Sequence, residues 1–111
     1  MTNSKRKGAV GEREWSSKLN SFGWEARRGQ QYNGIEGEDV VSELPFHWEV
    51  KRVQRLELTG AVDQAKRDTE WKTPVVAHRK NHCEWLITMQ ADEFLNLLRF
   101  VDLEDYERNK Q

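Results

Sequence analysis

The chain lacks a second cysteine, a long apolar run and a strong net charge. Its single cysteine, Cys83, excludes an internal disulfide and is compatible with a reducing cytoplasm. No apolar stretch approaches the ~20 residues that span a bilayer, and the N-terminus lacks the apolar core of a signal peptide. These absences lead us to expect a soluble domain rather than a secreted or membrane-spanning one.

Length and composition limit what the chain can build. It has 111 residues, of which 33% are charged and 36% hydrophobic. A chain of this length forms one domain with a single core, and the charged third predicts an extensive polar surface.

A net charge of −1 argues against a nucleic-acid partner until its distribution is considered. Residues 101–111 carry a net charge of −2, which leaves about +1 for the remainder. The basic residues also gather in short clusters, at 5–7, 27–28, 51–55, 66–67 and 79–80. A phosphate backbone requires such a basic stripe rather than a basic total. Solvated faces carry charge runs as well, so each cluster alone decides nothing.

Hydrophobic periodicity predicts a mixed α/β domain. We expect helices over residues 7–22, from Thr59 or Gly60 onward, and over 91–100, and strands over 24–28, 39–42, 46–53, 73–79 and 85–89. Residues 29–37 form a polar loop, and 101–111 a charged, frayed tail. The order α-β-β-β-α-β-β-α describes a mixed sheet with a helix on each face.

The expected helices each carry an apolar stripe that we assign to the core. The assigned residues are Trp15, Leu19 and Phe22 in the first helix, Val62, Ala65 and Thr69 in the second, and Phe94, Leu95 and Leu98 in the third. We also place Trp48 and Trp85 in the core or in a dimer interface.

The most informative motif is an acid and a base that alternate along one strand. Glu49 and Lys51 project to one face, while Trp48 and Val50 project to the other. A turn at 43–45 would make a hairpin that brings Asp39 beside Glu49. Clustered carboxylates repel unless a proton or a cation lies between them, and oxygen-ligated divalent ions hydrolyse phosphodiesters by activating water. An ordinary amphipathic hairpin is the alternative.

Glu12 is a further acid in an unexpected place, because it shares the apolar stripe of the first helix with Trp15 and Leu19. Two interpretations stay open. The carboxylate lies at the edge of the stripe and pairs with Arg13 or Lys18, or it is held near a buried site.

Five motifs in order resemble the PD-(D/E)xK nuclease superfamily, and most closely the archaeal-type Holliday junction resolvases with their phage and bacterial relatives. The resemblance covers about residues 5–100. It is carried by Gly11-Glu12-Arg13-Glu14, Arg27-Arg28, Gly37-Glu38-Asp39-Val40-Val41, His47-Trp48-Glu49-Val50-Lys51-Arg52, and Pro74-Val75-Val76-Ala77-His78-Arg79 leading to Trp85-Leu86-Ile87, with Gln64 in the intervening helix.

The resemblance implies a restriction-endonuclease-like fold and a nuclease domain over residues 1–100. It implies that Asp39, Glu49 and the Val50 carbonyl bind Mg²⁺, or Mn²⁺ in its place, with Glu12 completing the acidic cluster. Lys51 would activate water and steady negative charge, assisted by Gln64. DNA contacts are expected from the basic and loop residues Lys5, Arg6, Lys7, Arg27, Arg28, Gln31, Arg52, Arg79 and Lys80.

Two departures from the family pattern concern the loop. Glu38 stands where the family often has proline, and the loop after the first strand has no serine; Gln31 or Asn33 is the candidate substitute. We expect a homodimeric resolvase of branched DNA in the cytoplasm, that of the host if the chain is phage-encoded. The alternatives are a general or flap-directed endonuclease and a catalytically silent DNA-binding module.

Overall fold

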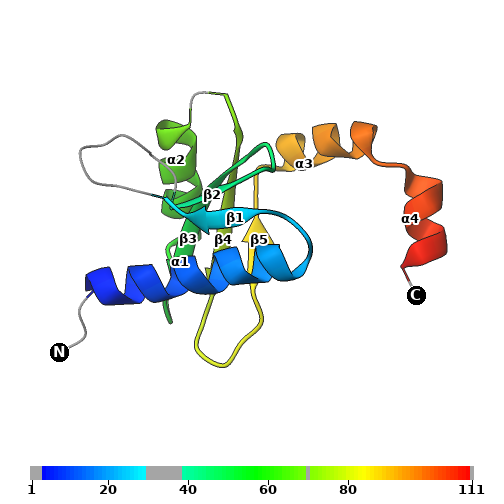
Figure 1. The fold of residues 1–111 in the computed structure, drawn as a ribbon. Helices are drawn as coiled ribbons and strands as arrows, with labels where there is room; N and C mark the ends of the chain where they lie inside the picture. Colours follow the sequence, from blue (N-terminus) through cyan, green and yellow to red (C-terminus); the bar gives the residue numbers. More distant parts are fainter. Residues whose placement is uncertain (1–3, 30–38, 70, 111) are drawn as a thin grey trace.

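The computed structural model describes residues 4–29, 39–69 and 71–110, with side chains from residue 8 onward in the first helix (Figure 1). The first half contains α1 (Ser4–Ser21), β1 (Ala26–Arg28), β2 (Val40–Ser42), β3 (Phe46–Arg52) and α2 (Leu58–Asp68). The second half contains β4 (Thr73–Arg79), β5 (Leu86–Thr88), α3 (Ala91–Leu97), the 3-10 turn η2 (Leu98–Phe100) and α4 (Leu103–Asn109). Up to α3, this is the predicted order of helices and strands.

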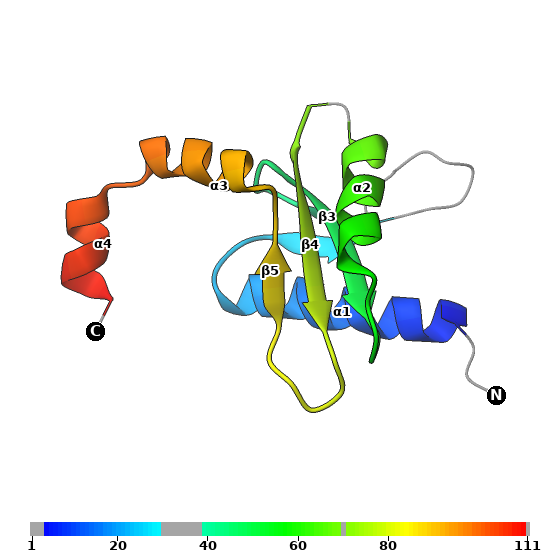
Figure 2. The same cartoon turned by 180° about the vertical axis from the view of Figure 1, so that it is seen from behind.

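The five strands form one mixed sheet in the order β1-β2-β3-β4-β5. Only β3 and β4 run parallel, since α2 connects them; the other neighbouring pairs are antiparallel. α1 covers one face and α2 the other, as the two opposite views show (Figures 1 and 2). The predicted helix on each face is confirmed.

The α1 face of the sheet carries the larger core. Trp15 and Leu19 of α1 pack on Val40, Trp48, Val50, Val75 and Ala77. The Trp15 ring lies 5.1 Å from that of Trp48 and 5.2 Å from that of Trp85, measured between centroids. Aromatic pairs at this spacing add to the stabilisation from buried area. The expected core positions of Trp15, Leu19 and Trp48 are therefore confirmed, with Trp85 half-buried beside them.

The α2 face carries a thinner core of Ala61, Ala65 and Val76, flanked by Leu56 and Val62. Two core assignments are wrong because helices end before them. Thr69 follows the last residue of α2 and bonds to the backbone of Lys72. Phe22 lies in the turn after α1, where Gly23 adopts a φ of +93°, and its side chain is exposed.

The C-terminal segment differs most from expectation. Phe94 and Leu95 of α3 are exposed rather than inward, and Leu98 is half-buried. Residues 103–109 form α4 instead of a frayed tail, because the Asp102 side chain accepts a hydrogen bond from the Asp105 N–H (3.0 Å) and caps the helix. Among the described helices, none has both the length and the apolar character to cross a bilayer.

Gly11 allows α1 to approach β3. A Cβ atom at Gly11 would lie 3.0 Å from Cβ of Arg52, whereas one at Gly8 meets nothing within 4 Å. We expect Gly8→Ala to raise the free energy of unfolding by up to about 1 kcal/mol, through helix propensity. Gly11→Ala should lose that gain and fall below it by about 1–3 kcal/mol through overpacking. Chemical denaturation measures both, and equal stabilisation would contradict the close approach.

Candidate active site

The pairing of β2 with β3 places the two candidate metal ligands opposite each other. Val40 pairs with Trp48, so continuing the antiparallel register by one residue sets Asp39 across from Glu49. The Val50 N–H donates a hydrogen bond to Asp39 Oδ2 (2.8 Å). The sequence-based prediction that the hairpin joins these acids is confirmed in its geometry.

The surroundings of Glu49 disfavour the ionised form of its carboxyl group. Glu49 is 3% exposed. Burial, then the charge of Asp39 and a hydrogen bond to it, raise the pKa of Glu49 to about 8, although Lys51 acts in the opposite direction. Within the described part of the chain, its Oε2 atom is buried without a hydrogen-bond partner. A proton or a cation would satisfy this group.

Lys51 follows on the same face of β3, as the alternation of the strand predicts. Its Nζ atom donates a hydrogen bond to Gln64 Oε1 on α2 (3.4 Å). Gln64 reaches the strand because Ala61, three residues before it, and Ala65, one residue after it, pack closely against the sheet. The pairing of Lys51 with Gln64 therefore depends on the small residues of α2.

Glu12 approaches from the α1 side of the sheet. Its partner is Arg28, whose Nε donates a hydrogen bond to Glu12 Oε1 (3.1 Å), and not Arg13 or Lys18. Burial raises the pKa of Glu12, the bond to Arg28 lowers it, and the charge of Asp39 raises it again. Glu12 thus interacts with Asp39 while it stays on the α1 side, so of the two open interpretations, the acid held near the site is the one that the structure favours.

Three candidate ligands of a divalent ion lie together: the carboxylates of Asp39 and Glu49 and the backbone of Val50. Within residues 4–29, 39–69 and 71–110, no three His, Cys, Asp or Glu side chains form a group that could hold a metal ion. A site of two carboxylates and one carbonyl does not require a third acid. Gln31 and Glu38 lie outside the described residues. The two residues that flank this segment are joined by a hydrogen bond from the Gly29 N–H to the Asp39 carbonyl (2.9 Å).

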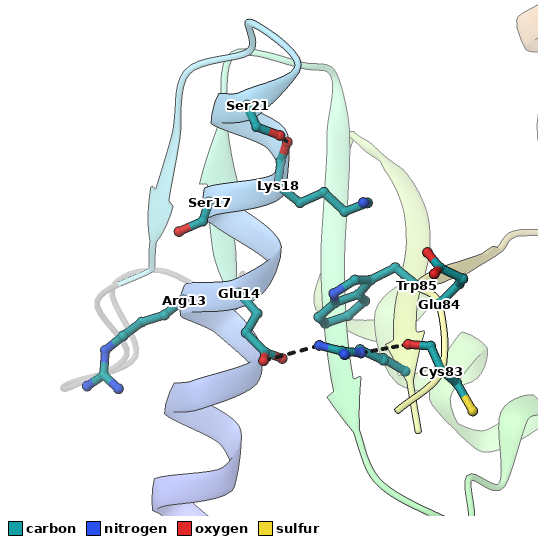
Figure 3. Close-up of a pocket in the computed structure, with 9 residues that line it drawn as sticks. Arg13, Glu14, Ser17, Lys18, Ser21, Cys83, Glu84 and Trp85 are labelled. Carbon is teal, nitrogen blue, oxygen red and sulfur yellow. Dashed lines mark hydrogen bonds and ion pairs between the residues drawn. The ribbon is translucent and has the colours of Figure 1, made fainter. Parts of the chain in front are cut away.

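The predicted phosphate contacts fall into different settings. Arg28 binds Glu12, and Arg52 and Arg79 both bind Glu14 (2.7 and 3.2 Å), which ties α1 to β3 and β4. Arg27 and Lys80 are exposed, while the side chains of Lys5, Arg6 and Lys7 lie outside the description. Arg79 and Glu14 both line a hollow of about 620 Å³ on the α1 side, and Figure 3 shows Glu14 at it. This hollow lies on the opposite face of the sheet from the Glu49 side chain, because Trp48 and Val50, which flank Glu49 along β3, face α1.

Two residues near the site had been given no role from the sequence. His47 is buried on the same face of β3 as Glu49, and strand alternation could have indicated it. Asp68, at the end of α2, contributes to raising the pKa of Glu49. Its position one helical turn after Gln64 was the available signal.

No protein-family model matches this chain, and a search of curated proteins finds no match either.

The raised pKa of Glu49 predicts a pH-dependent stability. The unfolded carboxyl ionises near 4.5, whereas the folded one holds its proton to about 8. Stability from this group is full below pH 4.5 and is lost as the pH rises to about 8. We expect Glu49→Gln to remove this loss, which amounts to a few kcal/mol because each pKa unit is about 1.4 kcal/mol.

Denaturation in EDTA across this pH range measures the effect. Glu84→Gln, an exposed glutamate, is the control and should follow the wild type. Parallel pH profiles for wild type and Glu49→Gln would contradict a buried, protonated carboxyl.

Proposed function

We propose that the protein is a divalent-metal-dependent endonuclease with a restriction-endonuclease-like fold, and that it cuts branched DNA as a homodimer. The observation that carries the proposal is the juxtaposition of Asp39 with the buried carboxyl of Glu49, whose pKa is raised to about 8. A buried carboxyl beside a second acid lowers stability unless a proton or a cation joins them, so a structural role alone does not explain the arrangement.

The residues present fit Mg²⁺ or Mn²⁺. Oxygen ligands suit these hard ions, and the unpaired, buried Oε2 of Glu49 supplies one beside Asp39, with the Val50 carbonyl next along the strand. A bound divalent ion supplies Lewis-acid stabilisation of the phosphate and a hydroxide nucleophile near neutral pH. The hydrogen bond from the Val50 N–H holds the Asp39 carboxylate beside Glu49, where the two would bind the ion.

Lys51 supplies the positive charge at the site. Its half-buried ammonium is held by Gln64, which fixes its direction relative to Glu49. A compact ammonium group there stabilises negative charge that develops on a phosphate, and it orients the attacking water. Glu12, paired with Arg28, holds further negative charge beside Asp39 from the other side of β2.

The choice of branched DNA is supported by the motif order across residues 5–100, which resembles the resolvases. Two like strands of a four-way junction are nicked most simply by two sites related by a two-fold axis. A general or flap-directed endonuclease uses the same residues and differs in substrate, and a silent binding module would not need the intact set of Asp39, Glu49 and Lys51.

Cleavage assays test the function and its alternatives. With Mg²⁺, we expect paired symmetric nicks in a four-way junction, little cutting of linear duplex or single strands, and none in EDTA. Asp39→Asn and Lys51→Met should each lower the rate by about 100-fold or more, since each removes a group that acts in the transition state.

Lys18→Met, on the α1 side, is the matched control and should cut at the wild-type rate. Equal cutting of duplex and junction would favour the general nuclease. Binding without cutting under every condition would leave only the binding module.

Metal binding has a readout that does not depend on cleavage. At pH 8, Mn²⁺ should raise the unfolding temperature of the wild type, with a gain of about 2.7 kcal/mol at a concentration 100 times the dissociation constant. Asp39→Asn and Glu49→Gln should lose this gain, whereas Glu84→Gln should keep it. An equal Mn²⁺ response in all four proteins would place the ion elsewhere.

A further inference from the structure

The C-terminal arm, which we define as residues 91–110, projects away from the rest of the protein (Figures 1 and 2). Its first turn is held where the Thr73 hydroxyl donates a hydrogen bond to Glu93 Oε2 (3.5 Å). The radius of gyration is 14.6 Å, against about 13 Å for a compact domain of this length. The arm contributes to this extension, because it lies beyond the edge of the sheet at β5 (Figure 1).

The arm exposes several large apolar side chains to water. A segment of this kind is stabilised when another surface covers those side chains. Phe100 is 86% exposed, Leu103 55% and Tyr106 60%, and Phe94 and Leu95 are exposed as well. α3 and α4 each have seven residues. Isolated helices shorter than about 12 residues are marginal in water, so these two need a covering surface.

A groove that also combines apolar and charged side chains lies on the α2 side of the sheet, near the β5 edge of the sheet. This groove of about 610 Å³, which we call the docking groove, is lined by Leu56, Leu58 and Leu86 together with the exposed cations Arg55 and Lys80. α2 packs over β3 and β4, so it separates the docking groove from the candidate active site beside β2 and β3.

The charges of the arm and the groove are complementary. The arm has six acidic and three basic residues, a net charge of −3, which leaves +2 for the rest of the chain. On α4, Glu104 and Glu107 alternate with Leu103 and Tyr106, so acidic and apolar groups occur together. The docking groove likewise places leucines beside charged residues, and its lining cations Arg55, Arg79 and Lys80 outnumber its lining acid, Glu84.

We propose that the C-terminal arm of one copy binds the docking groove of a second copy, and that the exchange is reciprocal. Isologous contacts of this kind close into a two-fold dimer. Aromatic side chains bury about 150–250 Å² each, and six of them in two exchanged arms reach the order of 1,000 Å² that a specific interface needs. The inference gives the proposed homodimer a surface, but it does not rest on nuclease activity.

A charge exchange between full-length variants tests the proposal. The arm variant carries Glu104→Lys and Glu107→Lys, and the groove variant carries Arg55→Glu and Lys80→Glu. Sedimentation equilibrium should show a wild-type dimer, and for each variant alone a dimer dissociation constant raised at least about tenfold. An equimolar mixture of the two variants should restore association to within about threefold of wild type, because opposite charges then face each other.

A third variant, with Lys66→Glu and Arg67→Glu at the exposed end of α2, changes the charge equally and should dimerise as the wild type does. Three results would overturn the proposal: a monomeric wild type at every concentration, including one whose arm folds back onto its own groove; an arm variant that dimerises normally; or a mixture that fails to restore association. Cleavage is not measured, so failure here leaves the nuclease proposal intact.

Discussion

The candidate site depends on two carboxyl groups that face each other across one antiparallel strand pair. Asp39 and Glu49 are neighbours because β2 begins at Val40, which pairs with Trp48 in the middle of β3. Glu49 is buried there. Their mutual repulsion has to be balanced locally. In the described chain the balance comes from the Val50 N–H, from the ammonium of Lys51, and from a proton that Glu49 retains up to about pH 8. The proposed divalent ion would replace that proton, which links the chemistry of the site to the stability of the fold.

The α1 side of the sheet supplies the rigidity that this balance requires. Trp15 packs between Trp48 and Trp85, and Gly11 lets the helix approach β3 closely. Glu14 then binds one arginine from each of the two parallel strands. Such half-exposed ion pairs add little stability individually, but a shared carboxylate fixes the register of three elements. The strand that carries Glu49 is therefore held from the face opposite the site.

Sequence patterns predicted the parts of this arrangement that depend on local periodicity. Strand alternation was enough to put Glu49 and Lys51 on one face, and turn residues were enough to bring Asp39 beside them. The core assignments were wrong where no other described element packs on the apolar residue. Periodicity shows which side chains share a face of a helix, but it does not show whether another element covers that face. Phe22 lies past the end of α1, Phe94 lies on the C-terminal arm, and both side chains are exposed. The arginine partner of Glu12 was missed for a related reason, since it comes from a neighbouring strand rather than from the same helix.

The unequal thickness of the two cores explains why the candidate site and the docking groove both lie beside α2. The core between α1 and the sheet is built around the rings of Trp15 and Trp48. On the α2 face the buried apolar side chains are Ala61, Ala65 and Val76, so the helix lies close to the sheet and packs over β3 and β4. Along one flank of the helix, Gln64 reaches Lys51. Along the other flank, the sheet edge stays uncovered and forms the docking groove. A bulkier residue at Ala65 would lift α2 from the sheet, and so it would disturb the candidate site and the groove together.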